Sequence, residues 1–149
     1  MRHKHLGTAA AAVVIALVSV TGISAASFML GPLVQVSGTS PFAADCDNHG
    51  DQTGTAFLNS EVEPWIDVNP TNPLRMIGVW QQDRWSNGGS RGLLAGVTTD
   101  GGASWVIGGD LKTSLCTGGT PSNGGGYQRA TDPWVTFGPT GIAYQLSLS

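Results

Sequence analysis

Two segments of the 149-residue chain repeat one pattern. Residues 63–72 and 132–141 each run acid, proline, tryptophan, then apolar, polar and apolar residues, and end in a proline-containing turn. An apolar stretch follows each segment. A unit of this kind cannot bury its apolar face alone and is stabilised by stacking against a like neighbour. The repeat therefore predicts stacked units of short strands.

The pattern around the repeat favours an all-β fold. Four strands are predicted in the first unit and two in the second, at 65–68, 75–81, 93–98 and 104–107, then from 134 and from 142. Few segments have a helical period, and Gly or Pro recurs about every ten residues. We expect a partial β-propeller over residues 61–149, with about one and a half four-stranded antiparallel blades. Because propellers close with about 4–8 blades, the remaining blades are expected beyond residue 149.

The N-terminus has the features of a secretory signal peptide. A basic start at residues 2–5 precedes an apolar run at 9–18 and small residues at 24–26. This order predicts a signal peptide at 1–26 that is cleaved near Ala26. After cleavage, the mature protein is expected to be secreted and not to stay in the membrane. The alternative is a retained membrane anchor, since no Asp, Glu, Lys or Arg lies between Lys4 and Asp45. Residues 27–60 are expected to form a lead-in segment.

Two cysteines, Cys46 and Cys116, occur in the predicted mature chain. In an exported protein an even count favours a disulfide. A zinc site is the weaker alternative, because two Cys and the single mature histidine, His49, do not complete a tetrahedron. Two unpaired buried thiols are the other alternative.

The charge pattern excludes some function classes. Beyond the leader, ten acidic residues face five basic ones, and this balance argues against a nucleic-acid partner. The sequence contains no phosphate-binding Gly-Lys-Thr loop and no Cys/His cluster, so no cofactor or metal is expected.

Residues 98–105 fit the pattern Ser/Thr-x-Asp-x-Gly-x-x-Trp through Thr98, Asp100, Gly102 and Trp105. We expect a hairpin turn in which Asp100 accepts backbone hydrogen bonds and glycines adopt positive φ. Trp105 has the apolar area to pack between neighbouring blades. A catalytic role for Asp100 is disfavoured, because the turn requires its carboxylate.

This motif resembles the Asp-box, or bacterial neuraminidase repeat, of sialidase-like β-propellers. The stretch from Glu61 to Ser149 is similar to secreted bacterial proteins of that superfamily, on the residues at 61–65, 81–89 and 129–134. The resemblance implies that the Asp-box is a folding element. It also implies a glycoside hydrolase of the exo-α-sialidase type, acting on glycan termini.

Strand alternation sorts the loops onto two faces of the expected propeller. The 69–74 turn and the Asp-box turn share one face, whereas the long 82–92 loop and the 108–131 connection share the other. The second face is the candidate site, because long polar loops on a rigid scaffold commonly carry function. Its charged and phenolic residues are Glu61, Glu63, Asp83, Asp110, Asp132, Arg84, Arg91, Lys112, Arg129 and Tyr127.

A sialidase needs arginines that clamp a carboxylate and a carboxylic acid that transfers a proton. Asp83 is the candidate acid, and Arg84 and Arg129 are the candidate clamp. The candidate substrate-binding residues are Glu63, Trp85, Arg91 and Asp132.

Each candidate also has a structural interpretation. Glu63 and Asp132 occupy equivalent repeat positions, which suits capping or hydrogen bonding between blades. Asp83 and Arg84 can form an ion pair that holds a loop, and Arg129 can bridge to Asp132. Trp85 can cover the loop instead of stacking on a sugar. The remaining tryptophans of the strands are expected in the core: Trp65, Trp80 and Trp134.

Two functions remain open at this point. The first is a sialidase-type glycoside hydrolase. The second is a non-catalytic propeller that binds glycan, protein or cell-wall material through the same face. A glycan or glycoconjugate is the expected partner, and the sequence leaves the oligomeric state open.

Overall fold

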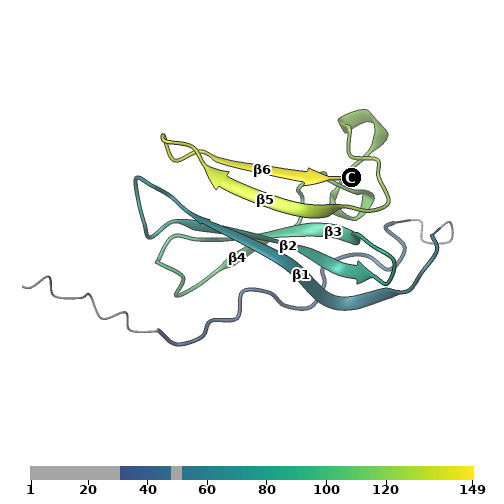
Figure 1. Cartoon of the computed structure of the whole chain (residues 1–149), viewed down its shortest axis with the longest axis horizontal. Helices are drawn as coiled ribbons and strands as arrows, with labels where there is room; N and C mark the ends of the chain where they lie inside the picture. The colour runs from purple at the N-terminus through teal and green to yellow at the C-terminus, as the bar shows by residue number, and fades with distance from the viewer. Residues whose placement is uncertain (1–30, 48–51) are drawn as a thin grey trace, which may run out of the picture. The chain divides into compact units, whose positions relative to one another are not determined.

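A computed structural model describes residues 31–47 and 52–149 (Figure 1). The predicted signal peptide at 1–26 and His49 lie outside these residues. The chain divides into two compact units, Met1–Gly31 and Pro32–Ser149, and the architecture described below is that of the second of them. Within the described part of the chain, no helix is long and apolar enough to cross a membrane.

Six strands make up the fold, which confirms the all-β prediction. A four-stranded antiparallel sheet contains β1 (Ala56–Val68), β2 (Met76–Trp85), β3 (Ser90–Thr98) and β4 (Val106–Gly108) in that order. A separate antiparallel hairpin contains β5 (Thr131–Phe137) and β6 (Ala143–Leu148). Two 3-10 turns, η2 (Leu115–Thr117) and η3 (Pro121–Asn123), lie in the connection from β4 to β5.

The strands are longer than predicted around the first hairpin. β1 begins at Ala56, inside the predicted lead-in segment, and β2 continues to Trp85. The predicted 82–92 loop is therefore wrong: only the tight turn 86–89 separates β2 from β3. The polar residues near Asp83 suggested a loop, but they are buried inside the sheet by partners distant in sequence.

The two repeat units pack face to face, with the β5–β6 hairpin over the sheet (Figure 1). Val135 of β5 is 1% exposed and packs with Val79 and Ala95, to which Ile77 and Leu111 add apolar contacts. Burying a valine side chain of this kind stabilises by about 1.5–3 kcal/mol. This small apolar cluster is the core between the two units.

Asp67 adds a polar contact between the same units. Its carboxylate accepts hydrogen bonds from the Phe137 N–H at 2.7 Å and from the Thr136 hydroxyl at 3.0 Å. The Phe137 N–H is the main cause that lowers the pKa of Asp67 below its ordinary value. Thr136 occupies the repeat position of Asp67, so this residue binds its own equivalent in the next unit.

The 98–105 turn has the predicted local geometry. Asp100 accepts hydrogen bonds from the Ser104 N–H at 3.0 Å and from the Ser104 and Thr98 hydroxyls at 2.5 and 2.7 Å. Gly101 and Gly102 adopt φ values of 76° and 92°. The Trp105 indole N–H donates to the Gly102 carbonyl at 3.2 Å.

Trp105 packs on the side of the sheet away from β5. Its ring lies beside Gly96, where an added Cβ would be 3.3 Å from Trp105 Cε3 and 2.9 Å from Val36 Cγ1. Gly96 is therefore needed for close approach. In the described chain, Trp105 thus lies near residues 31–47, which we call the N-terminal segment, and not between the two units.

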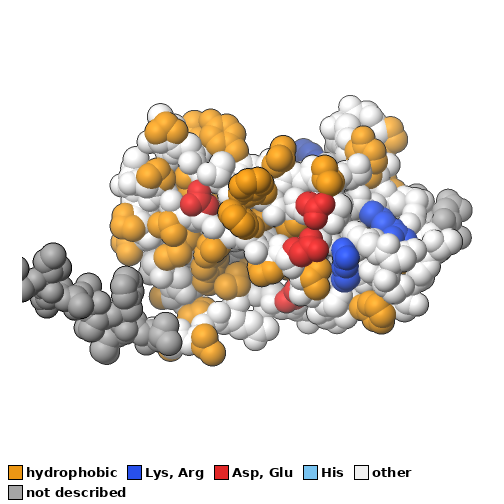
Figure 2. Space-filling model, in the orientation of Figure 1, with side chains coloured by type: hydrophobic (Ala, Val, Ile, Leu, Met, Phe, Trp, Pro, Cys, Tyr) orange, Lys and Arg blue, Asp and Glu red, His pale blue; other side chains and the backbone are white. Residues whose placement is uncertain are grey.

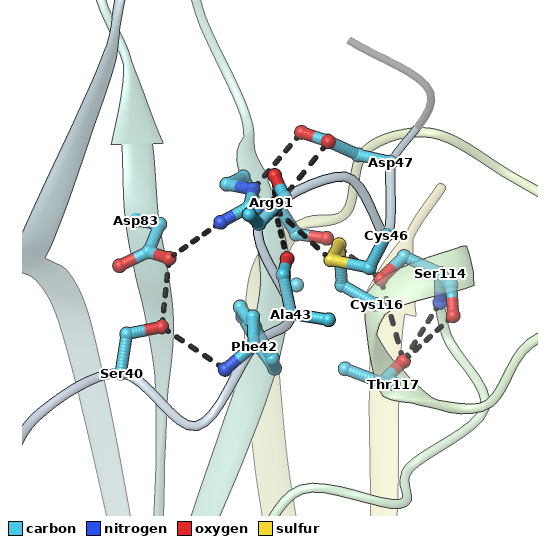
Figure 3. The surroundings of a disulfide bond; sticks show 12 residues. Ser40, Phe42, Ala43, Cys46, Asp47, Asp83, Arg91, Ser114, Cys116 and Thr117 are labelled. Atoms are coloured by element: carbon cyan, nitrogen blue, oxygen red, sulfur yellow. Dashed lines mark hydrogen bonds and ion pairs between the residues drawn. A yellow bond between two sulfur atoms is a disulfide. The ribbon is translucent and has the colours of Figure 1, made fainter.

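A disulfide joins Cys46 to Cys116, as predicted, with a Cα–Cα distance of 4.8 Å (Figure 3). It connects the N-terminal segment to η2. Asp47 lies beside the two sulfurs. Because these are bonded to each other, they offer no thiolate to a metal ion.

The first prediction concerns this disulfide. The double variant Cys46→Ser, Cys116→Ser should lower the free energy of unfolding by about 4 kcal/mol, because the bond closes a loop between residues 70 positions apart. Urea unfolding under non-reducing conditions measures this change. Reductant should destabilise the unmodified protein equally and leave the variant unaffected; a variant as stable as the parent would contradict the prediction.

The second prediction concerns Asp100. Hydrogen bonds, chiefly from the Ser104 side chain, lower its pKa well below the ordinary 3.8. The ionised carboxylate should therefore stabilise the fold fully above about pH 5, and this contribution should decline as the pH falls below 3.8. Urea unfolding of the parent and Asp100→Asn between pH 7 and pH 2 should show a stability difference that shrinks in acid. Ser104→Ala should reduce the same difference, and a pH-independent difference would refute this assignment.

Candidate functional site

Arg91 lies in a buried polar network between the sheet and the N-terminal segment (Figure 3). Its Nε is 3.0 Å from Asp47 Oδ2, and its Nη1 is 3.3 Å from Asp83 Oδ2. Its Nη2 donates to the Ala43 and Ala44 carbonyls at 2.6 and 2.8 Å. Arg91 is 3% exposed, and both carboxylates are fully buried. The guanidinium therefore holds the N-terminal segment and does not face solvent.

Asp83 is equally enclosed. Its carboxylate also accepts hydrogen bonds from the Ser40 hydroxyl at 2.7 Å and the Asn59 N–H at 2.8 Å. The register of β2 and β3 places Asp83 opposite Arg91, because Arg84 pairs with Ser90. The predicted pair of Asp83 with Arg84 is therefore wrong: Asp83 pairs with Arg91, and Arg84 donates to Gln81 and to the Gly89 carbonyl instead. A fully buried carboxylate has no route to a substrate in this structure.

Arg84 and Arg129 lie together at the turn 86–89. Arg84 donates to Gln81 Oε1 at 2.8 Å and to the Gly89 carbonyl at 3.3 Å. Arg129 donates to the Gly88 carbonyl at 2.7 Å, and also to Asn87, Thr53 and Gln52. The structure brings the two predicted clamp arginines together, but their guanidinium groups bind the turn. No hydrogen bond joins Arg129 to Asp132 in the described chain.

Trp85 lies beneath Arg129. The guanidinium carbon is 4.5 Å from the centre of the indole ring, and Trp85 is 4% exposed. Desolvation is the main cause that lowers the pKa of Arg129, against the opposing charge of Asp47. Because the ring is covered, it offers no face for stacking on a sugar, in agreement with the structural interpretation of this residue.

A solvent-facing groove lies where β1 and β5 meet. It has a volume of about 370 Å³ and is lined by the two equivalent repeat triplets Glu63, Pro64, Trp65 and Asp132, Pro133, Trp134. We call it the acid–tryptophan groove. Of the predicted site residues, only Glu63 and Asp132 line it.

The backbone at both acids has the same unusual conformation. Glu63 and Asp132 have φ values of 53° and 49°, in the left-handed region that non-glycine residues seldom adopt. Each lies within a register shift of its strand pair, between Val62 and Trp65 or between Thr131 and Trp134. Such bulges re-aim side chains. The two bulges therefore present acid and tryptophan to one groove from both units.

Trp65 and Trp134 are 46% and 55% exposed, whereas Trp80 is 6% exposed. The core prediction is confirmed for Trp80 and wrong for the other two. β1 and β5 are edge strands, so no described segment covers these rings fully. Their centres are 5.3 Å apart with an interplanar angle of 65°, an edge-to-face pair. The signal that could have identified them is their position directly after a proline in both repeats.

The groove is acidic. None of its six lining residues is Lys, Arg or His. Glu63 accepts a hydrogen bond from the Gln81 side chain, which in turn accepts one from Arg84. No hydrogen bond from the described residues reaches the Asp132 carboxylate, and Asp132 is exposed. In Figure 2, two acidic groups lie close together near the middle of the face, with hydrophobic side chains on one side and a basic side chain beside them on the other.

The third prediction tests the structural role of Arg91. Arg91→Met should lower the free energy of unfolding by about 3–5 kcal/mol, because it leaves two buried carboxylates without their cation. Urea unfolding measures the loss. Arg75→Met, at an exposed position, is the matched control and should change stability by about 0.5 kcal/mol or less. Equal stability of the two variants would contradict the assignment.

Comparisons with known proteins assign no function to these residues. No family model, curated protein or solved structure matches the chain.

Proposed function

We propose that this protein is a glycan-binding module of the β-propeller type, which binds its ligand in the acid–tryptophan groove. The observation that carries the proposal is the pair of half-exposed indoles of Trp65 and Trp134 beside the carboxylates of Glu63 and Asp132. Exposed large aromatic side chains that gather in a groove mark ligand-binding surfaces.

The chemistry of the groove suits a sugar. The C–H faces of a pyranose ring are apolar and stack on indole, while its hydroxyl groups donate hydrogen bonds to carboxylates. Trp65 and Trp134 supply the first contact, and the open Asp132 carboxylate supplies the second. The bulges that hold both acids in the left-handed region give the groove a preorganised shape.

The stacking of equivalent residues supports the propeller architecture. Trp65 contacts Trp134, and Asp67 binds Thr136, each pair being the same repeat position in two units. Contact between equivalent positions is expected where like blades lie side by side around an axis. The 98–105 turn has the hydrogen bonds that an Asp-box requires, which supports the same proposal.

An exposed apolar face of the β5–β6 hairpin also supports the propeller architecture. Strand pairing matches Val79 to Trp65 and Leu146 to Trp134, so Leu146 takes the position that Val79 has in the first unit. Val79 is fully buried by β5, whereas Leu146 is 70% exposed. Tyr144, equivalent to Ile77 by the same pairing, is 58% exposed. The second unit thus repeats the surface on which the first unit accepts its neighbour.

Binding is favoured over sialidase-type hydrolysis by the surroundings of the candidate residues. A sialidase requires guanidinium groups that are free to clamp the substrate carboxylate. Arg84 and Arg129 donate to the turn 86–89, and Asp83 and Arg91 are buried. The two acids that line the groove, Glu63 and Asp132, would repel an anionic sugar.

The fourth prediction tests the groove with the purified protein and a panel of neutral, acidic and amino oligosaccharides. Trp65→Ala and Trp134→Ala should each weaken binding by about tenfold or more, the effect of removing a central aromatic contact. Isothermal titration calorimetry measures the affinity. Tyr127→Ala, a half-exposed aromatic residue outside the groove, is the control and should bind like the parent.

Two outcomes would contradict the proposal. One is a folded protein that binds no member of the panel. The other is turnover of a fluorogenic sialoside that is lost in Arg84→Ala and Arg129→Ala variants, which would favour the hydrolase.

A further inference from the structure

We propose that the acid–tryptophan groove selects sugars that carry a protonated amine, such as glucosamine oligomers, over neutral and anionic sugars. The inference rests on the proposed glycan binding and adds the charge of the ligand. It follows from two independent features of the groove, the sign of its charge and the arrangement of its rings.

The first feature is the negative charge of the residues that line the groove. Two acids line the groove, and no cationic side chain lines it with them. Arg84 is linked to Glu63 through Gln81, which accepts a hydrogen bond from Arg84 and donates one from its amide N–H to the glutamate. One glutamate oxygen and both aspartate oxygens accept no hydrogen bond from the described residues. A positively charged ligand is therefore attracted by two carboxylates, whereas an anionic ligand is repelled by them.

The second feature is the angle between the rings. The indoles of Trp65 and Trp134 meet at 65° with centres 5.3 Å apart, so the edge of one ring lies against the other and the pair forms an angled aromatic surface. The face of an indole carries negative potential and attracts an ammonium group within about 6 Å. Two aromatic rings with carboxylates beside them suit the binding of an organic cation. A neutral sugar would stack on the rings and hydrogen-bond to the carboxylates, without the attraction between opposite charges.

Sugar stacking and ammonium recognition can occur in one ligand. The groove holds about 370 Å³, which suits a short saccharide rather than a single ion. An amino sugar places its ammonium group directly on the ring that stacks, so both contacts form within one residue of the ligand. The ligand is therefore an amine-bearing sugar.

The fifth prediction compares glucosamine oligomers with N-acetylglucosamine oligomers of equal length, below the pKa of the sugar amine. The amine form should bind about tenfold more tightly, because two weak ion pairs and a cation–π contact add together. Asp132→Asn and Glu63→Gln should each reduce this preference by about threefold, because the amide keeps an oxygen that accepts hydrogen bonds from sugar hydroxyls but loses the charge that attracts the amine. Both substitutions keep the shape of the side chain, and asparagine also tolerates the left-handed backbone at 132.

The control variant is Asp110→Asn, which removes the same charge at an exposed position outside the groove and should preserve the preference. Raising the salt concentration should reduce the preference, since exposed ion pairs are screened. Cooperative urea unfolding of each variant shows that it is folded.

The outcomes separate the two proposals. Equal affinity for both oligomers, with loss of binding in Trp65→Ala, would overturn the selection for amines and leave glycan binding in place. A preference that survives both carboxylate substitutions would place the amine elsewhere and overturn the inference as well. Absence of binding to either oligomer by the folded protein would overturn both proposals.

Discussion

Val135 reaches from β5 onto Val79 and Ala95, and this apolar contact brings the two repeat units together. The groove exists because of it, since the triplets that line the groove come one from each unit. The contact also sets the register between units, as Trp65 meets Trp134 and Asp67 meets Thr136. Packing of the two units in this way places the repeated acid–proline–tryptophan motif beside its own copy.

A second set of contacts holds the N-terminal segment to the first unit. The Cys46–Cys116 disulfide and the Arg91 guanidinium lie next to each other, with Cys46 Sγ 3.1 Å from Arg91 Nη2. A buried charge is tolerated only where paired and hydrogen-bonded, and Arg91 meets this condition through two carboxylates and two carbonyls. These contacts remove Asp83 and Arg91 from the solvent-facing surface.

Sequence patterns predicted part of the candidate site. Strand alternation places Glu63 and Asp132 on the candidate face, and both line the groove. Their recurrence at equivalent positions had pointed to a structural role. Trp65 and Trp134 were assigned to the core, since a tryptophan in a strand is usually buried. Their exposure arises from the bulges and from the edge positions of β1 and β5, neither of which the alternation of residues reveals.

The sequence by itself determined the features that depend on neighbouring residues: the strands, the repeat and the hydrogen-bonded turn at 98–105. It also indicated the disulfide, because only two cysteines were available in a chain with a predicted export signal. Only the tertiary structure decided which charged residues face solvent. Asp83 and Arg91 are buried by Ser40 and Asp47, which lie more than forty positions away in the chain. Burial of a charge depends on such distant partners, and spacing along the sequence does not encode them.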